Sequence, residues 1–551
     1  MKRNDNICTE NSSKENIICG LTNNSMYEFL VERASFWLEE TAIVYEGKYI
    51  TYYELIKSIN MISNSLLSLG IGKGDIVSIA VNNCPEAIAI IYAINRIGAI
   101  ANILHSLLPK EELQHFVEST KSKALFLSEG MFERISGISW NTCPLIICYK
   151  FEIEAEHVTN NFNNKEEIQL NDKLTWDEFL ELSICDITQI ETDPDETALI
   201  LYSGGTMGKQ KGICLTNRNI NSYAILSHEI AGRLLRVRSL AVLPIFHGFG
   251  LCSGIHNMLT CCSCVFLVPY FKPEVCNKLI FKEKIEVIFG VLAIYESLIH
   301  SDEIRKSDCS FFKLLYCGGD QLSVKTENRI NTLLTKQNSH VRILTGYGLT
   351  ECVAGCMSNT NYFVKEGTVG IPYPDIDMKI VEPGTDNQVP IDVPGELCLC
   401  GPTVMKGYYN DEVATKKALR LHSDNRVWLH TGDEFSVDKE GFYTFHNRLG
   451  RMLVVNGYNV YPEMIENALQ QIQGISKSCV IGKKAKAGGD MIIGVVSVND
   501  SKLTPTSIIK KCKEIVPEYA VPHQIRIWDQ LPLTKVGKVD HLKVFEEING
   551  V

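Results

Sequence analysis

Short apolar runs alternate with segments of helical periodicity along most of the chain, and this alternation constrains the fold more than any other feature. The run VSIAV at 77–81 has the pattern of a buried strand, and the segment that follows it up to Gly98 is compatible with a helix. Similar runs lie at 124–128, 240–245, 286–291 and 312–319. Strands that alternate with helices are typical of α/β folds with parallel sheets. We therefore predict an α/β protein.

The pattern changes twice toward the C-terminus. From 367 to 409 the apolar runs are short and punctuated by Gly and Pro, which predicts a small antiparallel β unit extending to about 445. After Arg448 a separate piece begins, with a predicted helix at 462–471 and predicted strands at 478–481 and 491–498. We expect an N-terminal domain over 1–449, made of stacked α/β sheets plus a small β-barrel subdomain. A small, mobile α+β domain is expected over 450–551.

Composition excludes several classes of protein. The 551 residues are 45% hydrophobic and 22% charged, which is ordinary for a globular protein and excludes wholesale disorder. A net charge of −11 argues against a protein that coats nucleic acid. No run reaches the ~18 apolar residues of a spanning helix, and the polar first ~24 residues lack a secretory h-region. The expected location is the cytoplasm.

The 20 cysteines do not have the spacing of zinc motifs or of a small secreted disulfide framework. Free cysteine is buried like a small hydrophobic residue. We expect reduced thiols in the core rather than metal or disulfide roles.

A glycine-rich loop follows the apolar strand that begins at Ala198. It combines glycines with hydroxyls and lysines: Ser203, Gly204, Gly205, Thr206 and Lys211 are the predicted phosphate-binding residues. Glycines let backbone N–H groups approach an anion, hydroxyls donate to it, and lysines neutralise its charge. The alternative is a charged surface turn. A Walker A loop is excluded because Gln210 follows Lys209 where Ser or Thr is required.

This segment resembles the signature loop of the adenylate-forming superfamily, which comprises acyl-CoA and aryl-CoA ligases, peptide-synthetase adenylation domains and luciferases. Further motifs of that family follow in order over nearly the whole chain: PIFHGFG (244–250), CGGD (317–320), GYGLTE (346–351), GELCLCGPTVMKGYYN (395–410), HTGDEF (430–435), EGFYTFHNRLGR (440–451), NGYNVYPEMIE (456–466), PEYAVP (517–522) and PLTKVGKVD (532–540). The motifs closest to those of this chain are in acyl-CoA ligases. The resemblance implies ATP and CoA as cosubstrates and Mg²⁺ as the cofactor.

The resemblance implies that Tyr347 presents a flat face to adenine, Thr350 a hydroxyl to phosphate and Glu351 a hard oxygen ligand to Mg²⁺. The glycines and acid of the same motifs are implied to line the nucleotide site: Gly318, Gly319, Asp320, Gly346 and Gly348. The alternative for this segment is a glycine-rich turn before a helix, with Thr350 as the N-cap.

Asp433, expected just after a strand, and Arg448 are implied ribose ligands; an ordinary turn aspartate and a surface ion pair are the alternatives. Lys538 resembles the catalytic lysine that the small domain brings over the active site, although a lone lysine in a terminal loop is usually only solvated. Such a lysine aligns the acid with the ATP phosphate and stabilises transition-state charge.

The resemblance also implies a two-step cycle in which the small domain rotates. Gly450 occupies the hinge position, and glycine permits the backbone change. Gly457, Tyr458 and Asn459 belong to the loop that lines the pantetheine tunnel after rotation.

His247 follows Phe246 where amino-acid-activating relatives carry Asp, so an amino-acid substrate would leave its ammonium unpaired. In acyl- and aryl-CoA ligases this His guides the carboxylate, although a satisfied core histidine is the alternative. The predicted acid pocket is apolar and includes small residues: Phe246, Gly248, Phe249, Ser253, Gly290, Val291, Cys317 and Val353.

The predicted function is ATP-dependent activation of a non-amino carboxylic acid to an acyl-adenylate and transfer to CoA. A medium-chain or branched fatty acid is favoured, with an aryl acid next. The main alternative is an enzyme that loads a separate carrier protein's phosphopantetheine, because no carrier domain follows Val551. A non-catalytic nucleotide-binding scaffold would be expected to lack Lys538, Glu351 or Asp433, and all three are present. A luciferase-like oxidase is a further alternative that the sequence does not exclude.

Overall fold

The computed structural model describes most of the chain from Thr22 onward. The described residues are 22–128, 131, 135, 138, 140, 145–149, 173–183, 190–204, 210–319, 322, 324–448, 453–455, 458–460, 462–484, 490–499, 502–532, 539 and 541–550.

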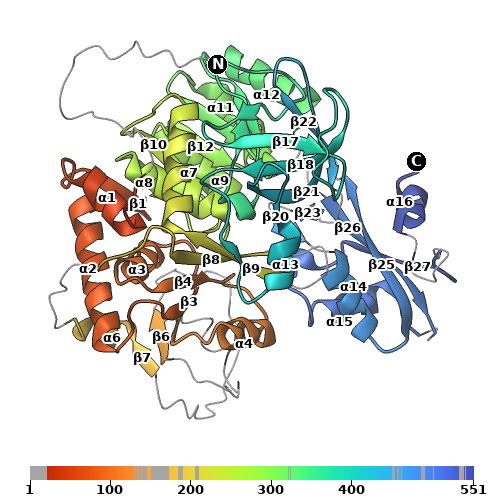
Figure 1. Ribbon diagram of the computed structural model, residues 1–551, viewed down its shortest axis with the longest axis horizontal. Coiled ribbons are helices and arrows are strands. Elements are labelled where there is room, and N and C mark those ends of the chain that lie inside the picture. Colours follow the sequence, from red (N-terminus) through yellow and green to blue (C-terminus); the bar gives the residue numbers. More distant parts are fainter. Residues whose placement is uncertain are drawn as a thin grey trace.

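Two large, mostly parallel sheets form the body of the molecule (Figure 1). The eight-stranded sheet has the order β19-β9-β8-β4-β3-β5-β6-β7, with strands Gly407–Tyr408, Gln210–Thr216, Thr197–Gly204, Ile100–Ile103, Ile76–Ala80, Ala124–Ser128, Leu145–Tyr149 and Lys173–Thr175. The nine-stranded sheet has the order β16-β15-β14-β13-β12-β10-β11-β1-β2, with strands Ile371–Pro372, Met357–Ser358, Ile343–Tyr347, Leu314–Cys317, Val287–Gly290, Arg238–Ala241, Cys264–Leu267, Thr41–Tyr45 and Lys48–Thr51. The predicted parallel α/β architecture is confirmed.

One continuous apolar core joins the two sheets through helices that carry buried residues of the same cluster. The helices in it are α1 (Met26–Ala34), α2 (Tyr52–Ser68), α3 (Pro85–Arg96), α7 (Asn217–Ile230), the π-helix η1 (Phe249–Asn257) and α8 (Met258–Thr260). Ten of the twelve α3 residues are buried, because the helix is apolar on all sides and so needs protein around it. Pro85 at its first position and the Cys84 N-cap fix where it begins.

The other helices that the structure describes before the five-stranded sheet are α4 (Lys110–Ser119), α6 (Trp176–Glu181), α9 (Pro273–Lys282), α10 (Leu292–His300), α11 (Asp302–Lys306), α12 (Val324–Lys336) and η2 (Thr350–Cys352). Helices α9 to α12 pack on a second apolar cluster against the nine-stranded sheet.

A five-stranded antiparallel sheet follows where the sequence predicts a small β barrel. Its strands are β17 (Asp377–Val381), β18 (Gly395–Cys400), β20 (Leu419–Leu421), β21 (Val427–Val437) and β22 (Tyr443–Arg448), with α13 (Glu412–Ala418) before β20. Strand β21 pairs with β18, β20 and β22. Asn219 of α7 donates to the carbonyls of Pro402 and Val404, which follow β18, and these partly buried hydrogen bonds attach that segment to the body.

The C-terminal part has its own apolar clusters, separate from the main core. It contains the two-stranded β23 (Leu453–Val455) and β24 (Tyr458–Val460), the three-stranded β25 (Ile475–Lys484), β26 (Asp490–Val498) and β27 (Gln524–Ile527), and the helices α14 (Pro462–Gln471), α15 (Pro505–Cys512), η3 (Glu518–Ala520) and α16 (His541–Asn549). Figure 1 shows it beside the body in blue.

Some predicted boundaries are wrong. The run at 240–245 forms a strand only as far as Ala241 and then turns toward His247, because Asn83 bonds the backbone around it. The strand predicted at 478–481 is the middle of the longer β25. The exposed connection predicted at 151–174 lies mostly outside the described residues.

In the described ranges, no helix is long and apolar enough to cross a bilayer. The 15 cysteines there that are recorded as free thiols are buried or partly buried.

Candidate active site

Four neighbouring parallel strands of the nine-stranded sheet, β10, β12, β13 and β14, end at the same edge, and the segments after them line a cavity of about 310 Å³. The carboxyl edge of parallel strands is where α/β proteins bind ligands. Among the predicted site residues, the cavity lining includes Lys211, His247, Gly248, Phe249, Val291, Gly318, Gly319, Gly346, Tyr347, Gly348, Thr350, Glu351, Val353 and Asp433. The structure therefore brings together predicted residues as far apart in the sequence as Lys211 and Asp433.

Three glycines of this lining are required by close backbone packing. A Cβ at Gly248 would lie 1.8 Å from the Val353 carbonyl oxygen, and a Cβ at Gly348 would lie 1.6 Å from that of Ala354. A Cβ at Gly346 would lie 1.6 Å from the Tyr316 hydroxyl. These glycines hold the loop after β14 against its neighbours, so the cavity wall there is backbone rather than side chain.

Val353 adopts a backbone conformation that β-branched residues rarely take. Its φ is 73° and its ψ is −62°, and the Ala354 N–H donates to the Cys352 carbonyl at 3.0 Å. This is a strained γ-turn, and such outliers cluster at functional sites. It follows η2, which begins at Thr350, so Thr350 is the first residue of this short helix rather than its N-cap.

Asp433 lies inside β21, not after a strand as expected. The pairing of β18 with β21 shifts between Glu396 and Cys398, so β21 continues through an irregularity that contains Asp433. Its carboxylate is buried and accepts a hydrogen bond from the Tyr347 hydroxyl. Arg448 is its direct partner across the β21–β22 ladder. The backbone thus places the two predicted ribose residues side by side.

Glu351 is held by Tyr408, whose hydroxyl donates to Oε1 at 2.9 Å. The Lys211 ammonium lies 4.8 Å from the centre of the same Tyr408 ring. Glu351 places a carboxylate in the cavity wall, and Mg²⁺ binds in proteins through one or two carboxylates together with substrate phosphates. The residues at Glu351 therefore fit the expected ion.

Three residues predicted in the acid pocket do not line the cavity. The Ser253 hydroxyl pairs with the Tyr223 hydroxyl at 2.6 Å inside the core. Cys317 packs in the apolar cluster under α9 to α12, and the Gly290 carbonyl accepts the Gly318 N–H. Gly290 and Cys317 are the last residues of β12 and β13, and the residues that follow them, Val291 and Gly318, line the wall instead.

Phe246 is also placed differently from the prediction: it lines a second, narrow pocket of about 40 Å³. We call this the junction pocket, because residues of the body and of the C-terminal part both line it: Ile103, Leu104, His105, Leu108, Phe116, Tyr202, Gln210, Phe246, His247, Tyr458 and Tyr519. Its centre is an aromatic stack. The His105 ring lies 4.1 Å from Phe246 and 5.1 Å from Tyr519, and Tyr519 stacks on Tyr458 at 4.6 Å.

Two histidines of the junction pocket are kept neutral by their surroundings. Burial lowers the pKa of His247 to about 4, and burial together with His247 lowers the pKa of His105 to about 3. His105 Nδ1 accepts the Leu107 N–H at 2.9 Å, which leaves the ring proton on Nε2. In the described part of the chain, Nε2 of either ring is buried with no hydrogen-bond partner. Such atoms usually await a ligand or water.

Several predicted residues lie outside the described residues: Gly205, Thr206, Asp320, Gly450, Gly457 and Lys538. For Ser203, Arg448 and Asn459 only the strand position is described. Ser203 and Gly204 end β8, where they pair with Lys211 and Gln210.

The sequence analysis missed most of the junction pocket and part of the cavity. His105 lies in no motif; Tyr519 lies inside PEYAVP and Tyr202 just before the glycine-rich loop, but their local sequence does not indicate that folding brings them to Tyr458. Tyr408 and Glu396 lie inside the GELCLCGPTVMKGYYN motif, which could have indicated them. Arg420 and Lys417 add two cations to the cavity lining, and no pattern in the sequence distinguishes them from surface charges.

Comparisons with known proteins bear on this geometry. The AMP-binding enzyme family matches residues 30–409, and the AMP-binding enzyme C-terminal domain matches residues 464–538. The chain is 26% identical to a long-chain-fatty-acid–CoA ligase of Bacillus subtilis (strain 168) over 96% of this chain and 95% of that protein. It is 28% identical to a long-chain-fatty-acid–CoA ligase of Escherichia coli O6:H1 over 96% of this chain and 95% of that protein. A probable 4-coumarate–CoA ligase of Dictyostelium discoideum is 27% identical over 81% of this chain and 80% of its own.

Two solved structures share the fold. An o-succinylbenzoate CoA synthetase from Bacillus subtilis superposes with a TM-score of 0.78 at 23% identity, covering 95% of this chain and 98% of its own. An amide bond synthetase from Marinactinospora thermotolerans gives a TM-score of 0.79 at 20% identity, covering 96% and 100%. The family match spans most of the residues that line the cavity. The chain therefore belongs to the AMP-binding enzyme family, within the adenylate-forming superfamily that its motifs resemble.

Proposed function

We propose that the chain is an AMP-forming acid–thiol ligase, which converts a carboxylic acid to an acyl-adenylate and then transfers the acyl group to CoA. The observation that carries this proposal is the position of His247, which lines both the cavity and the junction pocket. A carboxylate at His247 is then within reach of a nucleotide on one side and of a thiol on the other. The CoA ligases among the relatives support the same chemistry.

The cavity suits a nucleotide because it combines cations with a hydrogen-bonding end. Lys211, Lys417 and Arg420 supply positive charge for phosphates. Asp433 accepts from the ribose hydroxyls, and the Tyr347 ring, which packs edge-on against Phe435 at 4.7 Å, offers its face to the adenine. Glu351 would hold Mg²⁺, which supplies positive charge for the pyrophosphate leaving group.

The acid is a non-amino acid. His247 is neutral at pH 7, since its pKa is about 4, so it positions the carboxylate by a hydrogen bond and offers no negative charge to an α-ammonium group. The lining beside it is apolar, with Phe249, Val291 and Val353. This lining and the fatty-acid relatives favour a medium-chain or branched fatty acid, with an aryl acid next.

Lys538 completes the first step. When the C-terminal part rotates about Gly450, Lys538 contacts the acid and the α-phosphate, aligns them and stabilises the charge that develops. The carboxylate oxygen attacks the α-phosphorus and pyrophosphate leaves.

The junction pocket belongs to the second step. In this structure Tyr458 and Tyr519 of the C-terminal part lie against His105. The thiol of CoA enters along this aromatic stack, attacks the acyl carbonyl, and AMP leaves. The close-packed rings exclude water, which protects the mixed anhydride from hydrolysis. Nε2 of His105 donates to the incoming pantetheine.

A standalone enzyme that loads a carrier protein is the second candidate, since the same pocket accepts phosphopantetheine from either source. The test is acid-dependent pyrophosphate release over a panel of fatty, aryl and amino acids, repeated with CoA and with a phosphopantetheinylated carrier protein. We expect release with fatty acids and thioester formation with CoA. Preference for amino acids would contradict the role of His247, and thioester formation only on the carrier would favour the second candidate.

A further inference from the structure

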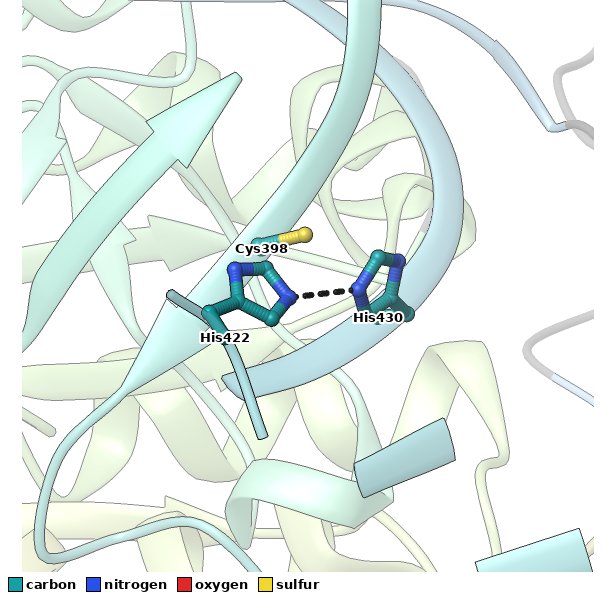
Figure 2. Close-up of side chains that lie close together, drawn as sticks. All are labelled: Cys398, His422 and His430. Atoms are coloured by element: carbon teal, nitrogen blue, oxygen red, sulfur yellow. Dashed lines mark hydrogen bonds between the residues drawn. The ribbon is translucent and has the colours of Figure 1, made fainter. Parts of the chain in front are cut away.

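Behind the proposed ribose site, three potential metal ligands meet at the five-stranded sheet. The Cys398 thiol and the His422 and His430 imidazoles have ligand atoms within 4.8 Å of one another, and all three residues are buried. In Figure 2 the two rings face each other edge to edge, and the Cys398 sulfur lies beside the gap between them. We call this set the β-sheet trio.

Strand pairing brings the trio together. Cys398 of β18 and His430 of β21 are direct partners in the antiparallel ladder. His422 follows β20, and its N–H donates to the Arg426 carbonyl in the turn that leads to β21. This turn places the His422 side chain next to Cys398 and His430. The Trp428 ring stacks on His422 with centroids 5.8 Å apart and fixes its orientation. The site is therefore built by strands and a turn, not by a sequence motif.

The hydrogen bonds in the trio prepare two imidazoles for a cation. His430 Nδ1 donates to Glu396 Oε2 at 3.0 Å, which leaves the lone pair of a neutral ring on Nε2. That atom lies 2.8 Å from His422 Nε2. A carboxylate behind a histidine is the arrangement that orients metal-binding imidazoles in proteins. Glu396 is itself held by the N–H groups of Gly384 and Gly432.

His422 has the freedom that metal binding requires. Its Nδ1 is buried and, in the described ranges, has no hydrogen-bond partner. The proton between the two Nε2 atoms can therefore reside on Nδ1 of His422 instead, so that both Nε2 lone pairs face the centre.

We propose that Cys398, His422 and His430 bind one Zn²⁺ ion, at a site separate from the Mg²⁺ expected at Glu351. A thiolate with two imidazoles is a borderline-soft donor set that suits zinc and not magnesium. Binding releases the Cys398 thiol proton to solvent and forms one Zn–S and two Zn–N bonds. Zn–N bonds of about 2.0–2.1 Å require the two Nε2 atoms to separate by roughly half an ångström. A water molecule takes the fourth position.

The ion would stabilise the strand that carries Asp433. His430 is three residues before Asp433 on β21, and Glu396 accepts the Gly432 N–H between them. Both His430 and Glu396 also line the cavity. Zinc would therefore join β18, the β20–β21 turn and β21 directly behind the proposed ribose site.

A second trio, Glu466, Cys479 and His541, has similar spacing in the C-terminal part. The His541 side chain is 37% exposed, and Glu466 already accepts the Val480 N–H at 2.6 Å. It provides a control and not a second proposal.

The test is metal binding by the purified full-length chain. Zinc content is measured by mass spectrometry after dialysis against a weak chelator, and Co²⁺ is added to the zinc-free protein to look for thiolate-to-cobalt charge-transfer absorption. Matched variants are Cys398→Ser and His422→Asn, with Cys400→Ser on the same strand face and Cys479→Ser in the second trio as controls. Circular dichroism establishes that each variant is folded.

We expect one zinc per chain and the cobalt–thiolate band in the parent protein and in both controls. Cys398→Ser removes the band, and His422→Asn weakens zinc binding. Glu396→Gln, which removes only the carboxylate behind His430, weakens zinc binding about 10–100-fold. Absence of retained zinc and of a cobalt–thiolate band in the parent protein would overturn the proposal. So would a band that survives Cys398→Ser and disappears in Cys479→Ser.

Discussion

The cavity and the junction pocket meet at His247 but are built in opposite ways. The cavity has walls of backbone and glycine, holds about 310 Å³, and carries charged groups of both signs. The junction pocket has walls of aromatic rings, holds about 40 Å³, and its two histidines are neutral. The body alone forms nearly all of the cavity lining, whereas the junction pocket needs Tyr458 and Tyr519 from the C-terminal part.

This difference indicates that each pocket serves a different half-reaction. A roomy, charged cavity suits a polyanionic nucleotide, and a narrow aromatic passage suits a slender thiol arm that must reach the acyl group without water. Changes to the cavity should therefore impair adenylation, and changes to the junction pocket should impair thioester formation.

The largest effect is expected for Lys538→Ala. If this lysine stabilises charge in the first step, adenylate formation falls roughly 10²–10³-fold. Thioester formation from supplied acyl-adenylate changes little. Pyrophosphate release measures the first reaction, and conversion of synthetic acyl-adenylate with CoA measures the second. Lys535→Ala, three residues away, is the control. An equal loss of rate in both half-reactions would contradict the assignment of Lys538 to adenylation alone.

Gly248→Ala tests the cavity wall. The new Cβ would lie 1.8 Å from the Val353 carbonyl oxygen, so the wall must move by about an ångström, which costs on the order of 10²-fold in adenylation. Gly254→Ala, in the π-helix η1 that Gly248 precedes, meets nothing closer than 3.9 Å and is the control. Pyrophosphate release by both variants at the parental rate would show that Gly248 is not part of the reacting geometry.

Tyr458→Ala tests the junction pocket. Loss of its stacking on Tyr519 and of its contact with His105 should lower thioester formation about two- to tenfold, the value of an aromatic contact, and leave acid-dependent pyrophosphate release unchanged. Phe545→Ala, an exposed aromatic residue of α16, controls for damage to the C-terminal part. A selective loss of pyrophosphate release instead would reverse the assignment of the two pockets.

The smallest effect concerns pH and stability. His105 and His247 titrate at about 3 and 4 in the folded chain but near 6.5 when unfolded, so the unfolded state binds more protons between these values. The free energy of unfolding therefore falls as pH falls below about 6.5, by up to about 1.4 kcal/mol per pH unit for each histidine. Urea unfolding at several pH values should show a shallower slope for His105→Gln. An identical slope in parent and variant would refute a buried neutral His105.

The residues that line the cavity could be predicted from the sequence better than those of the junction pocket, for a physical reason. The cavity is lined by loops after consecutive parallel strands, and each loop is a contiguous motif, so Gly346, Tyr347 and Glu351 could be identified from local pattern. His105 lies in no motif, and the motif that contains Tyr519, PEYAVP, does not reveal its neighbours; the two rings meet only when the C-terminal part packs on the body.

The same limit explains the misplaced residues and the β-sheet trio. Ser253 and Phe246 are in or beside the correct motif, but local sequence reveals neither which way η1 turns Ser253 nor which pocket Phe246 enters before that helix. Cys398, His422 and His430 have no zinc-motif spacing, since strand pairing rather than a short loop brings them together. The described free cysteines are buried or partly buried, as expected of core thiols. That expectation did not include the grouping of Cys398 with two histidines.

The most direct test of the two-step account is a single-turnover experiment with ATP labelled in the α-phosphate and a medium-chain fatty acid. The account predicts acid-dependent formation of labelled acyl-adenylate and pyrophosphate without CoA, and stoichiometric release of labelled AMP with acyl-CoA when CoA is added. Labelled ADP in place of AMP, or acyl-CoA formed with no acyl-adenylate before it, would contradict the account.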